Sequence, residues 1–170
     1  MAFVNLQVNM ADLPVAAGLE FEPMAEAYEK EVKTQLLIIW LPLLLLSFLP
    51  FLITWFPFLL LVPVSMLLLA GLISRLVIKK SRLKGIALRE HDLAYRSGLW
   101  WRKTVMLAFN RVQHVEVSSG PLQRKFGLAS LKFFTAGGSG VDLKVDGLES
   151  ERAEQIRAYI IARSDGPEAG

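Results

Sequence analysis

The chain has 170 residues, of which 53% are hydrophobic and 21% charged, and its formal net charge at pH 7 is +3. It contains no cysteine, which excludes a disulfide framework, thiol chemistry and cysteine-ligated zinc. Residues 34–74 carry no charged side chain, and a soluble domain of this size has no core that could bury so long a run. The high hydrophobicity also excludes an intrinsically disordered chain. We therefore expect an integral membrane protein with a modest polar portion.

Residues 34–78 are expected to form a transmembrane hairpin of two helices. A spanning helix needs about 20 apolar residues, whereas the whole uncharged run as one helix would extend about 60 Å. We place the first span at residues 36–55 and the second at 57–77. The turn falls at residues 54–57, where Pro57 suits the first turn of a new helix.

The basic residues predict how the hairpin is oriented. The turn at its tip carries none, whereas the segment that begins near the end of the second span carries six, namely Arg75, Lys79, Lys80, Arg82, Lys84 and Arg89. Short cytoplasmic segments are enriched in Lys and Arg. We therefore expect a two-span protein of the cytoplasmic (inner) membrane with both termini in the cytoplasm.

The segment before the hairpin, residues 1–33, forms an acidic N-terminal leader. It contains Pro14, Gly18 and Pro23, so we expect it to be mostly irregular, with a short helix near residues 25–33 that leads into the membrane. A partner-binding helix and a solvated tail are both conceivable roles, and the composition favours the tail.

Residues 79–164 change to short runs in which apolar and polar residues alternate between Gly, Asn, Asp and Ser. This pattern is typical of strands and turns. It predicts strands at residues 86–88, 93–98, 100–109, 112–118, 129–135 and 141–145. Asp142 and Asp146, at the borders of the last strand, are expected to be solvated.

Two helical segments are predicted in the same region. Pro and Gly bracket a single helical turn at residues 121–127. Residues 150–163 have an apolar stripe of Ala153, Ile156 and Ile160 and read as one amphipathic helix, followed by a tail at residues 165–170. The fold class is therefore an α+β membrane protein, with a transmembrane α-helical hairpin followed by a bent antiparallel β-sandwich or barrel and a C-terminal capping helix.

Three separated motifs occur in the polar half: LAYRSGLW at residues 93–100, LAFNRVQHV at 107–115 and GPLQRKFGL at 120–128. In this order they resemble the bacterial PH-like (bPH2) membrane-flanked domain family, also called YdbS-like. The resemblance covers about residues 36–161. It implies a transmembrane hairpin just before a seven-stranded bent sandwich with a C-terminal helix. It also implies a membrane-tethered interaction module without catalysis, often assembled with larger relatives.

Basic residues dominate the region beside the membrane, where only Glu90, Asp92 and Glu116 are acidic between residues 75 and 132. An anionic leaflet attracts each such basic residue by about 1 kcal/mol. We hypothesise that four of them lie at the lipid headgroups, namely Lys79, Lys80, Arg82 and Lys84. The alternative is that they only set the topology of the hairpin.

A second candidate contact surface is the run Trp100, Trp101, Arg102 and Lys103. Adjacent strand residues point to opposite faces, so one Trp is expected in the core and the other at an interface with lipid or protein. The alternative is cross-strand packing of both rings. Nucleic acid could bind a basic aromatic strand, but the neighbouring hairpin argues against it.

The third candidate comprises Arg124 and Lys125 in the turn at residues 121–127. Their charges could hold an anion. The alternative is a structural turn, in which Phe126 is anchored in the core and Gly127 supplies an unusual backbone angle.

No catalytic or cofactor-binding pattern is recognised. His91 and His114 lack a further ligand at metal spacing, and the glycine-rich residues 137–140 precede a strand, so they read as a hairpin loop and not as a phosphate loop. We expect no enzyme activity, no cofactor and no metal.

The sequence thus predicts a membrane-anchored PH-like interaction module that serves as a non-catalytic subunit of a membrane protein assembly. The expected partners are the lipid bilayer and a related PH-like-domain membrane protein, or a second copy of this chain, with no nucleic acid. The alternative function is binding of anionic lipid headgroups, or sensing of envelope stress, at the inner leaflet.

Overall fold

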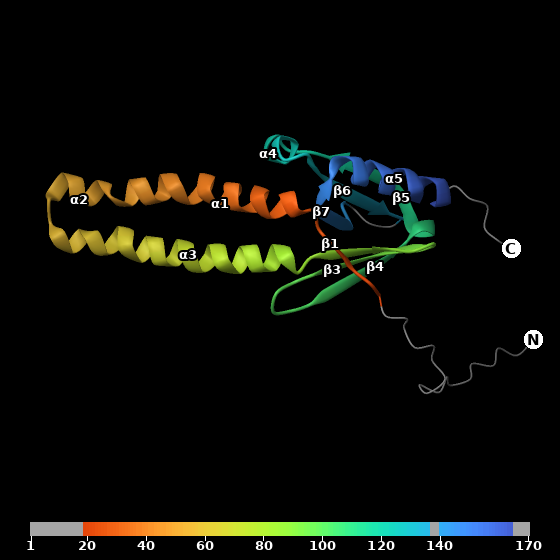
Figure 1. Cartoon of the computed structure of the whole chain (residues 1–170), viewed down its shortest axis with the longest axis horizontal. Helices are drawn as coiled ribbons and strands as arrows, with labels where there is room; N and C mark the ends of the chain where they lie inside the picture. The colour runs from red at the N-terminus through yellow and green to blue at the C-terminus, as the bar shows by residue number, and fades with distance from the viewer. Residues whose placement is uncertain (1–18, 137–139, 165–170) are drawn as a thin grey trace, which may run out of the picture.

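The uncharged run folds into two antiparallel helical arms that project from one end of a β-domain (Figure 1). The computed structural model describes residues 19–136 and 140–164. The hairpin consists of α1 (Glu26–Ser47), α2 (Leu49–Thr54), the 3-10 helix η2 (Pro57–Leu60) and α3 (Leu61–Arg82). Both arms are long and apolar enough to cross a membrane, so the structure contains the hairpin that the sequence predicts.

The tip of the hairpin turns at Trp55, within the predicted segment 54–57. Trp55 has a left-handed backbone conformation with φ of 53°, and its N–H donates to the carbonyl of Phe51 at 2.8 Å. Pro57 then begins η2, where the missing N–H of proline costs no helical hydrogen bond.

Apolar side chains cover the outer surface of both arms. Leu45 is 67% exposed and Leu68 is 71% exposed in the isolated chain. A helix that is hydrophobic all round needs an apolar environment, and here only lipid or another membrane helix could provide it.

The β-domain comprises two antiparallel sheets, in the strand orders β1-β2-β3-β4 and β5-β6-β7. The strands are β1 (Glu22–Pro23), β2 (Gly85–Leu88), β3 (Asp92–Ser97), β4 (Lys103–Ala108), β5 (Val112–Ser118), β6 (Leu128–Thr135) and β7 (Leu143–Glu149). Three short or capping helices complete it, namely η3 (Phe109–Arg111), α4 (Pro121–Lys125) and α5 (Ser150–Ser164).

The core of the β-domain lies between the two sheets and beneath α5. Leu93 of the first sheet and Phe133 of the second are fully buried in it. From α5, Ala153, Ile156 and Ile160 are buried in the same cluster, as the apolar stripe of this helix predicts.

The seventh strand comes from the segment before the hairpin. β1 pairs with β2 through Glu22 opposite Ile86 and Pro23 opposite Gly85, so one of the seven described strands lies in the leader, before residues 36–161 that the resemblance covers. Met24 then enters the core, and α1 runs without interruption from Glu26 into the membrane arm. The predicted helix near residues 25–33 that leads into the membrane is therefore confirmed as the start of α1, whereas residues 22–23 form a strand where irregular structure was expected.

The strand predicted at residues 100–109 is shorter than expected. Residues 98–102 form a turn, and β4 begins only at Lys103. Gly98 has φ of +113°, and a Cβ at this position would lie 1.9 Å from the carbonyl oxygen of Trp101. The chain therefore reverses tightly here, and the aromatic residues that resemble the start of a strand lie in the turn.

The last strand also differs from its predicted range of 141–145. β7 begins at Leu143 and continues to Glu149. Gly147, within this strand, has φ of +84°, a backbone conformation that residues other than glycine rarely adopt, and so the strand extends beyond residue 145. Asp142 precedes the strand and accepts hydrogen bonds from the backbone and hydroxyl of Thr135. The predicted loop at 137–140 lies mostly outside the described residues.

Candidate functional site

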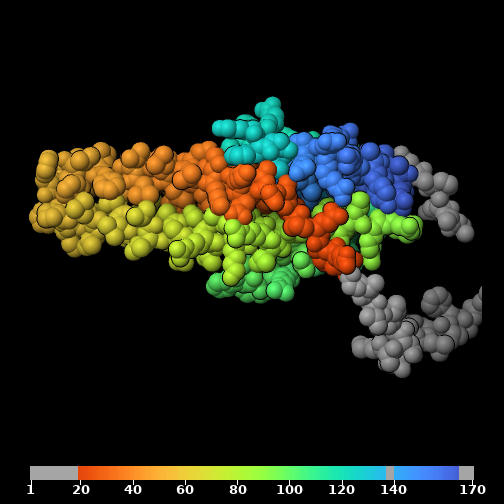
Figure 2. All heavy atoms as spheres, viewed as in Figure 1, coloured from red at the N-terminus to blue at the C-terminus, as the bar shows by residue number. Residues whose placement is uncertain are grey.

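Three elements lie around the base of the hairpin, at the end of the β-domain that faces it. They are the last turn of α3, the turn at residues 98–102 and α4, and we call them together the membrane-facing surface. In Figure 1 the β3–β4 turn reaches back beside α3, and α4 lies beside the start of α1. The space-filling view in Figure 2 shows both elements alongside the base of the hairpin.

The turn at residues 98–102 exposes two aromatic rings. Trp100 is 76% exposed and Trp101 is 86% exposed, so the expectation that one of them lies in the core is wrong. The reason is that neither belongs to a strand, and alternation between faces does not apply in a turn. Arg102 and Lys103 are exposed next to them.

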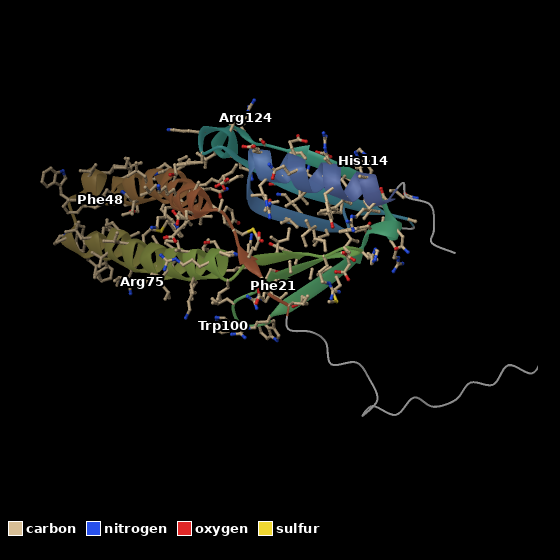
Figure 3. The ribbon with its side chains drawn as sticks, turned by 45° about the vertical axis from the view of Figure 1, so that its right-hand side comes forward. Phe21, Phe48, Arg75, Trp100, His114 and Arg124 are labelled. Carbon is tan, nitrogen blue, oxygen red and sulfur yellow. The ribbon has the colours of Figure 1, made fainter. Side chains whose placement is uncertain are left out.

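The short helix α4 contributes Arg124 and Lys125, both exposed. The side-chain oxygen of Gln123 accepts a hydrogen bond from the Gly120 N–H at 3.0 Å and so fixes the start of the turn. Gly127 has φ of +67°, as expected for a structural turn. Figure 3 places Arg124 and Trp100 on opposite sides of the hairpin base.

The four basic residues after the second span have different environments. Lys79 and Lys80 are exposed on the last turns of α3. Arg82 donates two hydrogen bonds of 2.7 Å to the carboxylate of Glu29. Lys84 has a side chain that is only 15% exposed. Lys84 is thus half-buried at the junction of hairpin and β-domain, and its contact with headgroups stays a prediction.

The half-buried side chain of Lys84 belongs to a polar network that joins the hairpin to the β-domain. Its ammonium donates to the Tyr28 hydroxyl of α1 at 2.7 Å and lies 4.0 Å from Asp146. Asp146 accepts hydrogen bonds from Ser130 at 2.8 Å and Lys144 at 2.9 Å. Because it has these partners, Asp146 is not the freely solvated residue that the sequence suggests.

The carboxyl of Asp146 remains ionised in this setting. Partial burial by itself would raise its pKa, but the hydrogen bonds from Lys144 and Ser130 outweigh burial, and the pKa lies below its ordinary value. A charged Asp146 therefore offsets part of the positive charge of Lys84 and Lys144 at the junction of hairpin and β-domain.

A pocket of about 180 Å³ opens between the leader and the turn at residues 98–102. Its lining includes the side chains of Phe21, Arg82, Lys84, Arg96 and Arg102. Sequence reasoning did not select Arg96. Its position at the polar end of a strand is visible in the sequence, but its proximity to Phe21 requires the fold.

A second, apolar groove of about 440 Å³ lies within the hairpin between α1 and α3. Trp40 and Leu44 line it from α1, and Leu67 and Gly71 line it from α3. This groove lies among the spanning segments, where lipid chains are the surrounding medium.

The two histidines have no shared ligand set. The His114 ring lies 5.6 Å from the ring of Phe134, and the backbone carbonyl of His91 accepts the N–H of Phe109. Within residues 19–136 and 140–164, no group of three or more His, Cys, Asp or Glu side chains could hold a metal ion.

Comparison with known proteins agrees with the architecture. The bacterial PH domain family matches residues 31–164. The UPF0699 transmembrane protein YdbS of Bacillus subtilis (strain 168) is 34% identical over 95 residues, which cover 55% of this chain and 58% of that protein. The match thus spans little more than half of the relative, and no solved structure matches significantly. With its apolar hairpin and two-sheet β-domain, the chain belongs to the bacterial PH domain family.

Proposed function

We propose that this protein is a membrane-anchored, non-catalytic interaction module whose PH-like β-domain binds a partner in a membrane protein assembly. The observation that carries the proposal is the open edge of β4. Of the described strands, β4 pairs only with β3, and its residue Met106 is 54% exposed. An unpaired strand edge offers backbone groups to a further strand.

The proposed partner is a related PH-like-domain membrane protein or a second copy of this chain. Such a partner would carry its own β-domain at the same height above the membrane, so its strand edge could reach β4 without a long linker. Both termini are proposed to lie in the cytoplasm, since Lys79, Lys80 and Arg124 surround the base of the hairpin. Nucleic acid is not proposed as a partner.

The assembly is tested by purifying the tagged full-length protein in a mild detergent and identifying co-purifying proteins by mass spectrometry. A stoichiometric membrane partner or a stable self-complex is the expected result. Met106→Glu should reduce its recovery at least tenfold, because a strand added to β4 would place a side chain directly beside residue 106 and partly desolvate the carboxylate. A solitary monomer would contradict the proposal.

The matched control is Ile161→Glu on α5. Ile161 is an exposed apolar residue like Met106, but it lies on the capping helix, away from the β4 edge. Recovery of the partner should be unchanged in this variant, and the melting temperatures of both variants should equal that of the wild type. Equal loss in both variants would rule out the β4 edge as the contact.

Contact of the membrane-facing surface with anionic lipid is a second candidate function. The specific observation that favours it is the exposure of both Trp100 and Trp101 beside Arg102 and Lys103. Trp rings are enriched at membrane–water interfaces, and basic residues near the surface are attracted to anionic leaflets. The two functions are compatible, since the β4 edge and the turn face different surroundings.

A further inference from the structure

The pocket beside the turn at residues 98–102 is lined by four cationic side chains and no carboxylate. Arg82 and Lys84 come from the end of the hairpin, Arg96 from the end of β3 and Arg102 from the turn. Arg82 is balanced by Glu29, and Lys84 lies near Asp146. Neither partner acid is part of the lining.

The other two cationic residues of the lining, Arg96 and Arg102, have no acidic partner of this kind among the residues that the structure describes. Arg96 and Arg102 form no ion pair with any residue of the described parts of the chain. Two guanidinium groups beside one pocket repel each other unless an anion lies between them. The pocket therefore has an uncompensated positive charge, although it lies in a folded junction and not on a mobile tail.

The fold holds Arg96 in place. Its guanidinium carbon stacks over the ring of Phe21 at 4.3 Å from the centroid, a cation–π contact. Phe21 in turn packs closely on Gly85: a Cβ added at residue 85 would lie 3.0 Å from the Cβ of Phe21. Since the stack restrains the guanidinium, less conformational entropy is lost when it binds an anion.

The chemistry of the lining selects the class of ligand. Guanidinium groups form paired hydrogen bonds to phosphate oxygens and are preferred where a phosphate is recognised. The pocket volume of about 180 Å³ suits a single phosphate group better than a large ligand. Leu83, which also lines the pocket, and the neighbouring Trp100 are exposed apolar groups, as a lipid-derived phosphate would require.

We propose that this pocket binds the phosphate group of an anionic phospholipid of the inner leaflet, with Arg96 and Arg102 as its principal ligands. The proposal rests on the proposed position of the membrane-facing surface at the headgroups. Its distinguishing claim is one specific lipid in a defined pocket, in contrast to diffuse attraction by the basic surface.

The test uses the purified full-length protein in a neutral detergent and measures bound lipid by native mass spectrometry. Phosphatidylglycerol is the probe, phosphatidylcholine is the zwitterionic comparison, and inorganic phosphate is followed by its effect on the melting temperature. One phosphatidylglycerol should bind at least tenfold more tightly than phosphatidylcholine. Equal affinity for the two lipids, or equally tight binding of inorganic phosphate, would overturn the proposal.

Variants assign the binding to the pocket. Arg96→Gln should weaken phosphatidylglycerol binding at least tenfold, and Arg96→Lys should also weaken it although the net charge is retained, because a lysine has no planar fork. Arg102→Gln tests the same pocket from an exposed turn, where the substitution cannot disturb the core.

The matched control is Arg111→Gln, which removes one exposed arginine from η3, away from the hairpin. Binding should be unchanged in this variant, and an equal loss in Arg96→Gln and Arg111→Gln would show diffuse attraction and overturn the proposal. The titration involves neither a bilayer nor a protein partner. A negative result for lipid binding would therefore not contradict the proposed assembly through β4. A negative result for the assembly would likewise not contradict lipid binding in the pocket.

Discussion

At the scale of single residues, the junction of hairpin and β-domain depends on close contacts at β7. The Ala25 N–H donates to the carbonyl of Gly147 at 3.0 Å, and the ring of Tyr28 covers the same glycine. Next to it, Asp146 is held by Ser130 and Lys144. The start of α1 thus packs on one segment of β7 through a backbone hydrogen bond and the ring of Tyr28.

Gly147→Ala tests this contact. Gly147 has φ of +84°, and an added Cβ would lie 2.5 Å from Cγ of Tyr28, so strain and overlap combine. We expect the free energy of unfolding to fall by about 2–4 kcal/mol, measured by thermal and chemical unfolding of the full-length protein in detergent.

Gly127→Ala is the control for that substitution. Its φ is +67° but nothing lies within 4 Å of the added Cβ, so only backbone strain of about 1 kcal/mol is expected. If Gly147→Ala proved no less stable than Gly127→Ala, Tyr28 would not pack on β7 as described.

At the scale of secondary structure elements, the turn at residues 98–102 is the element whose role depends most on its surroundings. It closes β3 and β4 tightly at Gly98, yet it leaves Trp100 and Trp101 without packing partners in the β-domain. Large exposed aromatic rings at the base of a membrane hairpin favour the headgroup region over bulk water.

The position of this turn can be measured by fluorescence. In a Trp40→Phe and Trp55→Phe background, Trp100 and Trp101 are the remaining tryptophans. In nanodiscs we expect lipids brominated near the headgroup to quench their emission several-fold more than aqueous acrylamide does. Stronger quenching by acrylamide would place the turn in water and argue against lipid contact.

The same turn also provides a control for stability. Trp100→Ala combined with Trp101→Ala should change the free energy of unfolding in detergent by less than about 1 kcal/mol, because both rings are exposed in the folded chain. A larger loss would mean that the rings pack within the protein.

At the scale of the whole molecule, the hairpin and the β-domain are one structural unit. β1 and the first turn of α1 precede the membrane arms, yet β1 pairs with β2, and Met24 and Tyr28 pack on the core of the β-domain. On the other side, only Leu83 and Lys84 separate α3 from β2. The orientation of the β-domain is therefore coupled to that of the membrane helices.

This coupling predicts how soluble fragments behave. A fragment of residues 84–164 lacks β1, Met24 and Tyr28, whereas residues 19–33 joined by a flexible linker to residues 82–164 restore them. Because α1 and α3 run side by side, a short linker suffices. We expect the joined version to be more stable by about 2–5 kcal/mol in chemical denaturation.

Met24→Ala in the joined version is the matched control, and it should remove part of the gain by leaving a cavity in the core. If the fragment of residues 84–164 unfolded at the same denaturant concentration as the joined version, the leader would make no energetic contribution to the β-domain.

Properties that depend on neighbouring residues could be predicted from the sequence alone. The hairpin follows from an uncharged run whose length fits two membrane crossings, and the stripe of Ala153, Ile156 and Ile160 follows from helical periodicity. The order of three local motifs indicated the family, and residues 31–164 match it. These predictions agree with the structure because secondary structure and membrane insertion depend on local composition.

Other features depended on contacts between distant parts of the chain, and only the tertiary structure decided them. A short leader segment becomes β1 because β2 offers it an edge, and Phe21 meets Arg96 only when that pairing has formed. Partial burial of Lys84 against Tyr28 likewise joins residues on either side of the hairpin. Periodicity predicts which face of a strand or helix a residue occupies, but it does not predict which element covers that face. In this protein the packing of the sheet against the hairpin determines which element covers it.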